Sequence, residues 1–347
     1  MLFGYPVEAT EDNWVHDCLC EIIATVHRNL QANEEPLSWP EIIPEQYRSW
    51  LSSRSGLKKR LETFRETLAT LDPDQRNQVL HALNSQNMIG PLLSCECDCA
   101  AISDLPVPIR APAKDFFNFS FKLLTGLGIR DHQYSIIYNS ISDHVCPFCG
   151  CEYFDAPGAP REAMDHYLPE SKYPFSAANL RNLVPMGNKC NSRYKIAQDI
   201  LFSDAGIRRR SFDPYNHDEI RISLNNSILF SGKNGELPLW KIDFDPNNEE
   251  VNTWDNVFHI RERYERDVLD PSFMTWLRGF RDWYRAIDNE NDSAGKLKNA
   301  IQSYCSHYEG EGFSDRGFLK AAFFRMLLKH CEEGNERLIT ILMDLKN

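Results

Sequence analysis

The sequence predicts an α+β fold: a mainly helical chain with two short central strands and a small antiparallel β meander after them. Three observations predict this class. Before residue 143 and again after Val251, apolar residues recur every three or four positions, as on one face of a helix. Between 211 and 245, apolar and polar residues alternate, which is typical of strands. Short extended pieces at 162–164 and 183–185 separate the two helical parts.

The first helical part contains several amphipathic segments. Spaced apolar residues predict a helix from Asn13 to about Ala32, and a second helical run covers 47–71. The triplet Asp72-Pro73-Asp74 is a strong start signal for a third helix, which we expect to reach about Ser85. We expect residues 94–113 to be irregular and 116–124 and 131–141 to form two short helices.

The part of the chain after residue 195 changes character twice. A helix is expected to continue through 196–200 and to fade near Gly206. Alternating segments at 220–224, 228–230 and 242–244 then predict the meander. Its turns are expected at Asn225-Asn226 and Lys233-Asn234-Gly235. Helical periodicity returns in the ranges 254–264, 273–287 (after a break at Asp270-Pro271), 317–331 and 336–345.

Composition argues against several classes of protein. The 347 residues carry a formal net charge of -12, which argues against a protein that coats nucleic acid indiscriminately. Because no run of eighteen or more apolar residues occurs, we expect no membrane span. The first residues lack a basic region followed by an apolar core, so we expect no secretory signal and a cytoplasmic protein.

The eleven cysteines favour free thiols and metal ligands over a disulfide framework, because their number is odd and no secretory signal precedes them. Cys95, Cys97 and Cys99 alternate in an acidic segment. Their spacing differs from the two-residue loop of a zinc knuckle, so an ordinary loop is favoured there over a metal site.

Residues 144–195 gather more metal-binding and proton-transfer groups than any other stretch. The groups are, in chain order, Cys146, Cys149, Asp165, His166, Asn182, Cys190, Asn191 and Lys195.

The chemistry of these groups suits a cation and a phosphate. Asp165 and His166 are neighbours at a strand end, so their side chains point in different directions. One can then bind a divalent cation while the other handles a proton. On a helix that begins near Lys189, Asn191 and Lys195 are four residues apart and share a face. Asn191 offers a hard oxygen ligand suited to Mg²⁺, and Lys195 offers positive charge for a phosphate.

Three motifs of this stretch, DHYLP, NLVP and CNSRYK, resemble the HNH, or ββα-metal, nucleases in order and spacing. The resemblance implies that a ββα-metal (HNH) core forms the centre of the α+β chain. It implies that His166 is the general base that activates water and that Asn182 orients the loop and His166. It further implies that Asp165 and Asn191 bind a catalytic Mg²⁺ or Mn²⁺.

The same resemblance raises the question of a structural zinc. Members of that family usually carry two Cys-x-x-Cys pairs, whereas the second pair here is Gly187-x-x-Cys190. A zinc on Cys146, Cys149 and Cys190 would need a fourth ligand, for which Cys151 and His144 are the candidates. This arrangement and a core without zinc both remain open.

A basic island lies beside this stretch. Residues 181–210 carry seven basic and two acidic side chains in a chain that is otherwise strongly acidic. We expect this island to contact a phosphate backbone, with a merely solvated face as the alternative. The residues expected to bind nucleic acid are Lys189, Arg193, Lys195, Arg208, Arg209 and Arg210.

The sequence therefore predicts three segments: a helical N-terminal domain (1–143), an HNH nuclease core (144–205) and a C-terminal region (206–347). It predicts a metal-dependent endonuclease that hydrolyses phosphodiester bonds, with DNA as the favoured substrate and RNA left open. The flanking segments are similar to HNH nucleases of bacterial anti-phage defence, some of which work beside a separate ATPase, as in Septu-type systems. The alternatives are a non-catalytic adaptor with the ββα fold and a standalone restriction enzyme for modified DNA.

Overall fold

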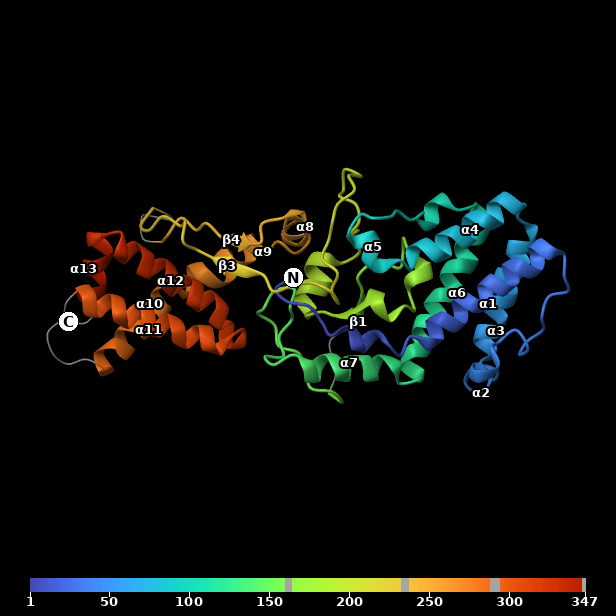
Figure 1. The fold of residues 1–347 in the computed structure, drawn as a ribbon, viewed down its shortest axis with the longest axis horizontal. Coiled ribbons are helices and arrows are strands. Elements are labelled where there is room, and N and C mark those ends of the chain that lie inside the picture. Colours follow the sequence, from blue (N-terminus) through green and yellow to red (C-terminus); the bar gives the residue numbers. More distant parts are fainter. Residues whose placement is uncertain (160–163, 232–236, 288–293, 345–347) are drawn as a thin grey trace. The chain divides into compact units, whose positions relative to one another are not determined.

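The computed structural model describes residues 1–159, 164–231, 237–287 and 294–344. The described chain is mainly helical and contains two antiparallel strand pairs, which confirms the α+β class. It divides into two compact units, each built from separated segments (Figure 1). One unit comprises Gly4–Ser142 and Phe154–His217. The other comprises Met1–Phe3, Asp143–Tyr153 and Asp218–Asn347. The three consecutive segments expected from the sequence do not follow these boundaries.

The unit that contains Gly4–Ser142 is built from helices and one strand pair. Its α-helices are α1 (Trp14–Ala32), α2 (Arg48–Leu51), α3 (Ser55–Thr70), α4 (Pro73–Gln86), α5 (Ile89–Leu93), α6 (Val107–Gly126) and α7 (Ile129–Ser140). The expected start of α4 is confirmed, since the Asp72 side chain accepts a hydrogen bond from the Gln75 amide and the Gln75 side chain bonds back to Asp72. This reciprocal cap satisfies amide groups that a helix leaves unpaired at its first turn.

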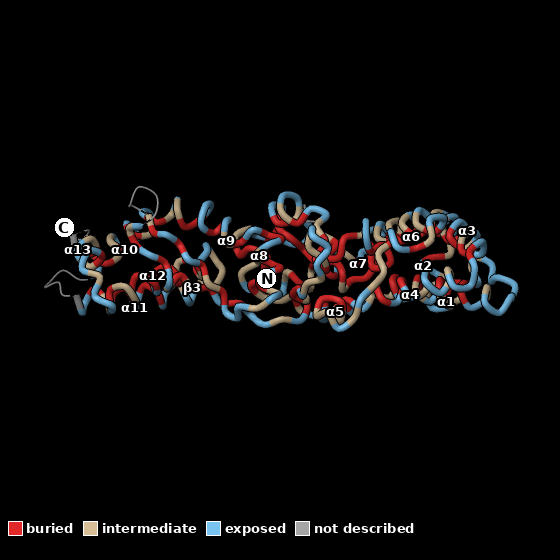
Figure 2. Tube along the Cα trace, turned by 90° about the horizontal axis from the view of Figure 1, so that it is seen from above, coloured by how far each residue is buried: buried red, intermediate tan, exposed pale blue. Residues whose placement is uncertain are grey.

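The core of this unit forms where helices bury their apolar faces. Buried positions run along α1, α3, α4 and α6, with exposed positions between them (Figure 2). Phe64 of α3 meets Phe116 of α6 with ring centroids 6.1 Å apart, and Phe117 of α6 meets Phe175 edge-on at 5.1 Å. The second contact brings α6 against the segment between the two central strands.

Several helix boundaries differ from the expected ones. The run expected at 47–71 is two helices, and α6 begins at Val107 inside the stretch expected to be irregular. Pro108 lies in the first turn of α6, where its missing N–H costs little, and burial of Ile109 and Ala113 favours the helix there. The helix expected at 196–200 is absent, because Ile196 takes φ 47° and ψ -115°.

The central strands are β1 (Met164–His166) and β2 (Leu183–Pro185), as the extended segments predict, although Glu162 and Ala163 lie outside the described residues. They pair antiparallel, with Asp165 opposite Val184 and His166 opposite Leu183. A helix follows and widens into the π-helix η6 (Cys190–Lys195), in which the Ile196 amide bonds to Asn191 O, five residues back, at 2.8 Å.

The other unit has a strand pair packed with helices. Strand β3 (Arg221–Ser223) pairs antiparallel with β4 (Asp243–Asp245), and an isolated bridge joins Ile228 to Leu239. In the described residues, the expected meander is thus one antiparallel hairpin, because the segment that contains β3 and Ile228 pairs along its length with the segment that contains Leu239 and β4. The turn expected at 233–235 lies outside the described residues.

The helices of this unit follow strand β4. They are α8 (Glu249–Phe258), α9 (Ile260–Arg263), the π-helix η8 (Tyr264–Leu269), α10 (Asp270–Ile287), α11 (Ala294–Glu311), α12 (Gly317–Glu332) and α13 (Glu336–Asp344). The expected break at Asp270-Pro271 is wrong, since α10 begins there directly after η8, whose wider turns already depart from α-helical hydrogen bonding. Across the described ranges, we find no helix with the length and hydropathy needed to span a membrane.

Candidate active site

Strand β1 presents Asp165 and His166 to different surroundings. His166 is buried, whereas the Asp165 side chain keeps 20% of its surface exposed. Successive residues of a strand point to opposite faces, so the two side chains cannot share one environment. The acid therefore has access to solvent on one side of the strand, and the imidazole is packed on the other.

The hydrogen bond of His166 defines its tautomer. Its Nε2 lies 2.9 Å from the carbonyl oxygen of Ala177. A carbonyl only accepts hydrogen bonds, so Nε2 carries the proton and Nδ1 is left with a lone pair in the neutral ring. Nδ1 faces Glu170 Oε2 at 3.8 Å, too far for a direct hydrogen bond but suited to a shared donor such as water.

Packing keeps this imidazole neutral. Its ring centroid lies 4.4 Å from that of Phe121, and burial lowers the pKa of His166 below its ordinary value of 6.5. The nearby carboxylate of Glu170 acts in the opposite direction, as does the bond to Ala177, but desolvation is the larger effect. At pH 7 His166 is therefore a proton acceptor rather than a cation.

The side chain of Asn182 holds the loop between β1 and β2 through several hydrogen bonds. It is fully buried, and its Oδ1 accepts the Leu168 amide at 2.7 Å. Its Nδ2 donates to Leu168 O at 3.1 Å and to Ser176 O and Oγ at 3.3 and 3.1 Å. Because Leu168 and Ser176 both lie between His166 and Ala177 in the chain, the Asn182 amide holds the segment that joins the imidazole to its carbonyl acceptor.

Lys195 lies inside the protein, not at the phosphate-facing surface where we expected it. Its side chain is 1% exposed, with Nζ 2.9 Å from Asp165 Oδ2 and 2.6 Å from the carbonyl oxygen of His166. A buried ammonium needs such partners, because an unpaired charge costs several kcal/mol in a protein interior. The π-helix and the reversal at Ile196 direct Lys195 toward β1.

Asn191 precedes Lys195 by one turn and is half-buried. Its main-chain amide and carbonyl groups form helical hydrogen bonds with Gly187 and Ile196. Its side-chain amide forms no hydrogen bond with the described residues. The amide oxygen of Asn191 and the exposed part of the Asp165 carboxylate are hard oxygen donors, the kind that Mg²⁺ and Mn²⁺ prefer. Lys195 lies against one of the two oxygens of Asp165, so the other oxygen is the one that remains accessible to a ligand.

The expected phosphate contacts separate into two groups. The guanidinium group of Arg208 donates hydrogen bonds to Asp98 and to main-chain oxygens, including those of Leu201 and Cys97. Arg209 donates to the main-chain oxygens of Ile200 and Asp199, and burial lowers its pKa. Both arginines thus hold the loops around them. The exposed members of the basic island are Lys189, Arg193 and Arg210.

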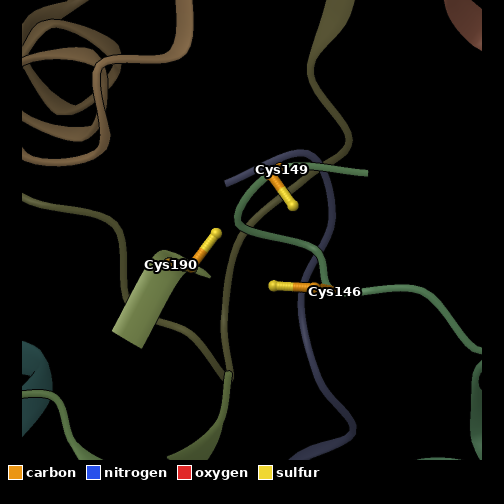
Figure 3. A group of neighbouring side chains, drawn as sticks. All are labelled: Cys146, Cys149 and Cys190. Atoms are coloured by element: carbon orange, nitrogen blue, oxygen red, sulfur yellow. The ribbon is translucent and has the colours of Figure 1, made fainter. Parts of the chain in front are cut away.

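Three cysteines of the stretch come together (Figure 3). The sulfur atoms of Cys146, Cys149 and Cys190 lie within 4.8 Å of one another, and all three residues are buried. Thiolates on a tetrahedral zinc at about 2.3 Å stand roughly 3.8 Å apart, so the group needs little movement to bind one. Neither proposed fourth ligand, Cys151 or His144, belongs to this group among the described residues.

Cys95, Cys97 and Cys99 form no metal-binding group in the described part of the chain, and the loop is held by Arg208 instead. Residues that sequence analysis missed include Glu170, which faces His166, and Phe121, which packs on it. Glu170 follows His166 by four residues in an irregular loop, a spacing that predicts no contact outside a helix. Phe121 comes from a distant helix and gives no signal in the sequence.

No family model, no curated protein and no solved structure matches the chain.

Proposed function

We propose that the protein is a metal-dependent endonuclease of the HNH type that hydrolyses phosphodiester bonds in DNA. The observation that carries the proposal is the contact of His166 Nε2 with the carbonyl oxygen of Ala177, which assigns the proton to Nε2 and leaves Nδ1 facing Glu170. A neutral imidazole with an available nitrogen is the form that a general base requires near pH 7. The strand pair followed by a helix, with Asp165 and Asn191 on the first strand and the helix, supports a ββα-metal core.

In this proposal, His166 Nδ1 accepts a proton from a water molecule, whose oxygen attacks the phosphorus atom. The bond from phosphorus to the leaving oxygen breaks, and a proton from solvent completes the released hydroxyl group. Asp165 and Asn191 would hold the divalent ion, which when bound stabilises charge on the phosphate and leaving oxygen. Asn182 keeps the loop and the imidazole in place, and Arg193 and Lys189 offer charge to the phosphate backbone.

Cleavage of plasmid DNA with Mg²⁺ or Mn²⁺ tests the proposal. His166→Ala should lower the rate by a factor on the order of 10² to 10⁴, because it removes the general base. The exposed His81→Ala variant is a matched control and should cut like the wild type. Equal cutting by wild type and His166→Ala would refute the assigned mechanism.

A non-catalytic nucleic-acid or protein adaptor is the second candidate, and one observation favours it. Asp165 is already paired with the buried ammonium of Lys195, which opposes the approach of a second cation. Titration of the protein with Mn²⁺ in a calorimeter separates the two candidates. DNA binding that persists with a salt dependence, without any binding of Mn²⁺, would favour the adaptor.

The wider role we propose is that of an effector in anti-phage defence that works with a separate ATPase. This role rests on the resemblance of the flanking segments. Purification of the tagged protein from its native host, followed by mass spectrometry, tests it. A co-purifying ATPase supports the effector role, and activity on methylated DNA without any partner points to a standalone restriction enzyme instead.

A further inference from the structure

The carbonyl oxygen that holds His166 belongs to a short turn in the loop between β1 and β2. This turn runs from Phe175 to Asn179 and has Ala177 at its centre. Its position decides where His166 Nε2 finds an acceptor, since the oxygen of Ala177 is the partner of that nitrogen. The atoms that hold the turn therefore also determine the orientation of the imidazole.

The C-terminal end of α4 holds both ends of this turn. Gln86, the last residue of α4, is fully buried; its Oε1 accepts the Phe175 amide at 3.0 Å, and its Nε2 donates to Ala100 O at 2.8 Å. The adjacent Asn87 donates through Nδ2 to Phe175 O at 3.3 Å. Its Oδ1 accepts from Asn179 Nδ2 at 3.1 Å.

The start of α1 adds a third contact at the far end of the turn. Asn13 Oδ1 accepts the Leu180 amide at 2.9 Å, and its Nδ2 lies 3.4 Å from Asn179 Oδ1. These bonds lie within one unit of the protein and join the N-terminal helices to the loop of the candidate active site. Loops are usually the least rigid part of a site, whereas helix ends that are packed in a core are rigid.

We propose that Gln86 and Asn87 are positioning residues for His166, which act by holding the turn that carries the Ala177 carbonyl group. The inference deepens the proposed function and rests on it for its catalytic consequence. Under this inference, the end of α4 helps to position the imidazole, a role that the sequence does not indicate. Without the two amides, the carbonyl group of Ala177 moves and the proton of His166 is no longer confined to Nε2.

Three variants test the assignment. Asn87→Ala removes the bonds to Phe175 and Asn179 at a half-buried position, and Gln86→Met removes the bonds of Gln86 at nearly constant side-chain volume. Asn84→Ala, at an exposed position on the same helix, is the matched control. Circular dichroism and thermal melting show which variants fold, and Asn87→Ala carries the test if Gln86→Met does not.

Nitrogen-15 NMR of the histidine rings, at one fixed neutral pH, reads the tautomer without any need for activity. The His166 signals are assigned by their loss in His166→Gln. Wild type and Asn84→Ala should both show a protonated Nε2 and a bare Nδ1. Asn87→Ala and Gln86→Met should lose this pattern and show averaged nitrogen shifts of two tautomers. Folded variants of Gln86 and Asn87 that keep the wild-type pattern would overturn the inference.

Cleavage kinetics form the second arm. The two positioning variants should lose activity on the order of 10-fold to 100-fold, the range seen for residues that orient a catalytic ligand, with the loss in kcat rather than in KM. If the tautomer changes but no protein form cleaves DNA, the inference stands and the proposed function fails. If wild type cleaves and the folded positioning variants match it in both rate and tautomer, the inference fails and the function stands.

Discussion

The Nζ atom of Lys195 lies 2.9 Å from Oδ2 of Asp165, in the interior rather than on the surface of the protein. The contact joins the end of η6 to the strand that carries both candidate catalytic residues, because the same ammonium also donates to the carbonyl oxygen of His166. A residue type that usually contacts phosphate thus acts here as a fixed internal cation.

Loss of this ammonium should destabilise the fold. Lys195→Met leaves the Asp165 carboxylate without its partner, and we expect about 3 kcal/mol lower free energy of unfolding in urea titrations. This is the low end of the range for broken buried pairs, because Asp165 remains 20% exposed. Arg193→Met, an exposed change in the same π-helix, should stay within about 0.5 kcal/mol of wild type. A Lys195→Met protein as stable as the control would show that the pair contributes nothing.

The basic island should separate into residues that bind phosphate and residues that hold the fold. Arg193→Ala should weaken DNA binding and reduce the slope of log K against log salt by about 1. Arg208→Ala should instead lower the stability by roughly 1 to 3 kcal/mol, because it removes several hydrogen bonds to partly buried main-chain oxygens and leaves that of Cys97 without this donor. Fluorescence anisotropy at several salt concentrations measures the slopes. A lower slope for a folded Arg208→Ala protein would contradict this division.

Acid should weaken the helical unit through His16. This side chain is buried on α1, and desolvation lowers its pKa from 6.5 to about 4. The unfolded chain therefore binds a proton that the folded chain excludes, so stability falls as pH drops below 6.5 and continues to fall until about pH 4. The loss attributable to His16 at about pH 5 is about 2 kcal/mol relative to neutral pH.

A variant isolates this effect. His16→Leu removes the titrating group, so its free energy of unfolding should vary less between pH 7 and 5 than that of wild type. His81→Leu, at an exposed position on α4, is the control. The same pH dependence in wild type and His16→Leu would assign the acid sensitivity to other groups.

The three buried thiols should bind zinc. Atomic spectroscopy of the purified protein should find about one zinc per chain, and Cys190→Ser should lose it because only two sulfur ligands remain. Cys95→Ser, outside the group, should retain the metal. A zinc content near zero in the wild-type protein would end this proposal.

Much of the secondary structure follows from local sequence. Apolar spacing places α1, α12 and β2 within a few residues of their observed limits, since these patterns are short-range and need no knowledge of the partner. The Asp72-Pro73 signal marks the start of α4 because its capping bonds lie within four residues. The N-terminal part of α6, whose first turn contains proline, is not predicted from local sequence, because burial against α3 and the β1–β2 loop favours a helix that local propensity disfavours.

The amino-acid sequence shows which chemical groups lie in residues 144–195 and predicts that two short strands and a helix carry them. The directions in which those groups point depend on the fold. Lys195 turns inward because the π-helix and Ile196 redirect it, and Arg208 turns to main-chain oxygens because the loop around Cys97 surrounds it. Gln86 and Asn87 join the site from another helix. The sequence shows that a charged or amide side chain is present at a position. Its hydrogen-bond partner lies about a hundred residues away in the chain, and local sequence patterns do not indicate such partners.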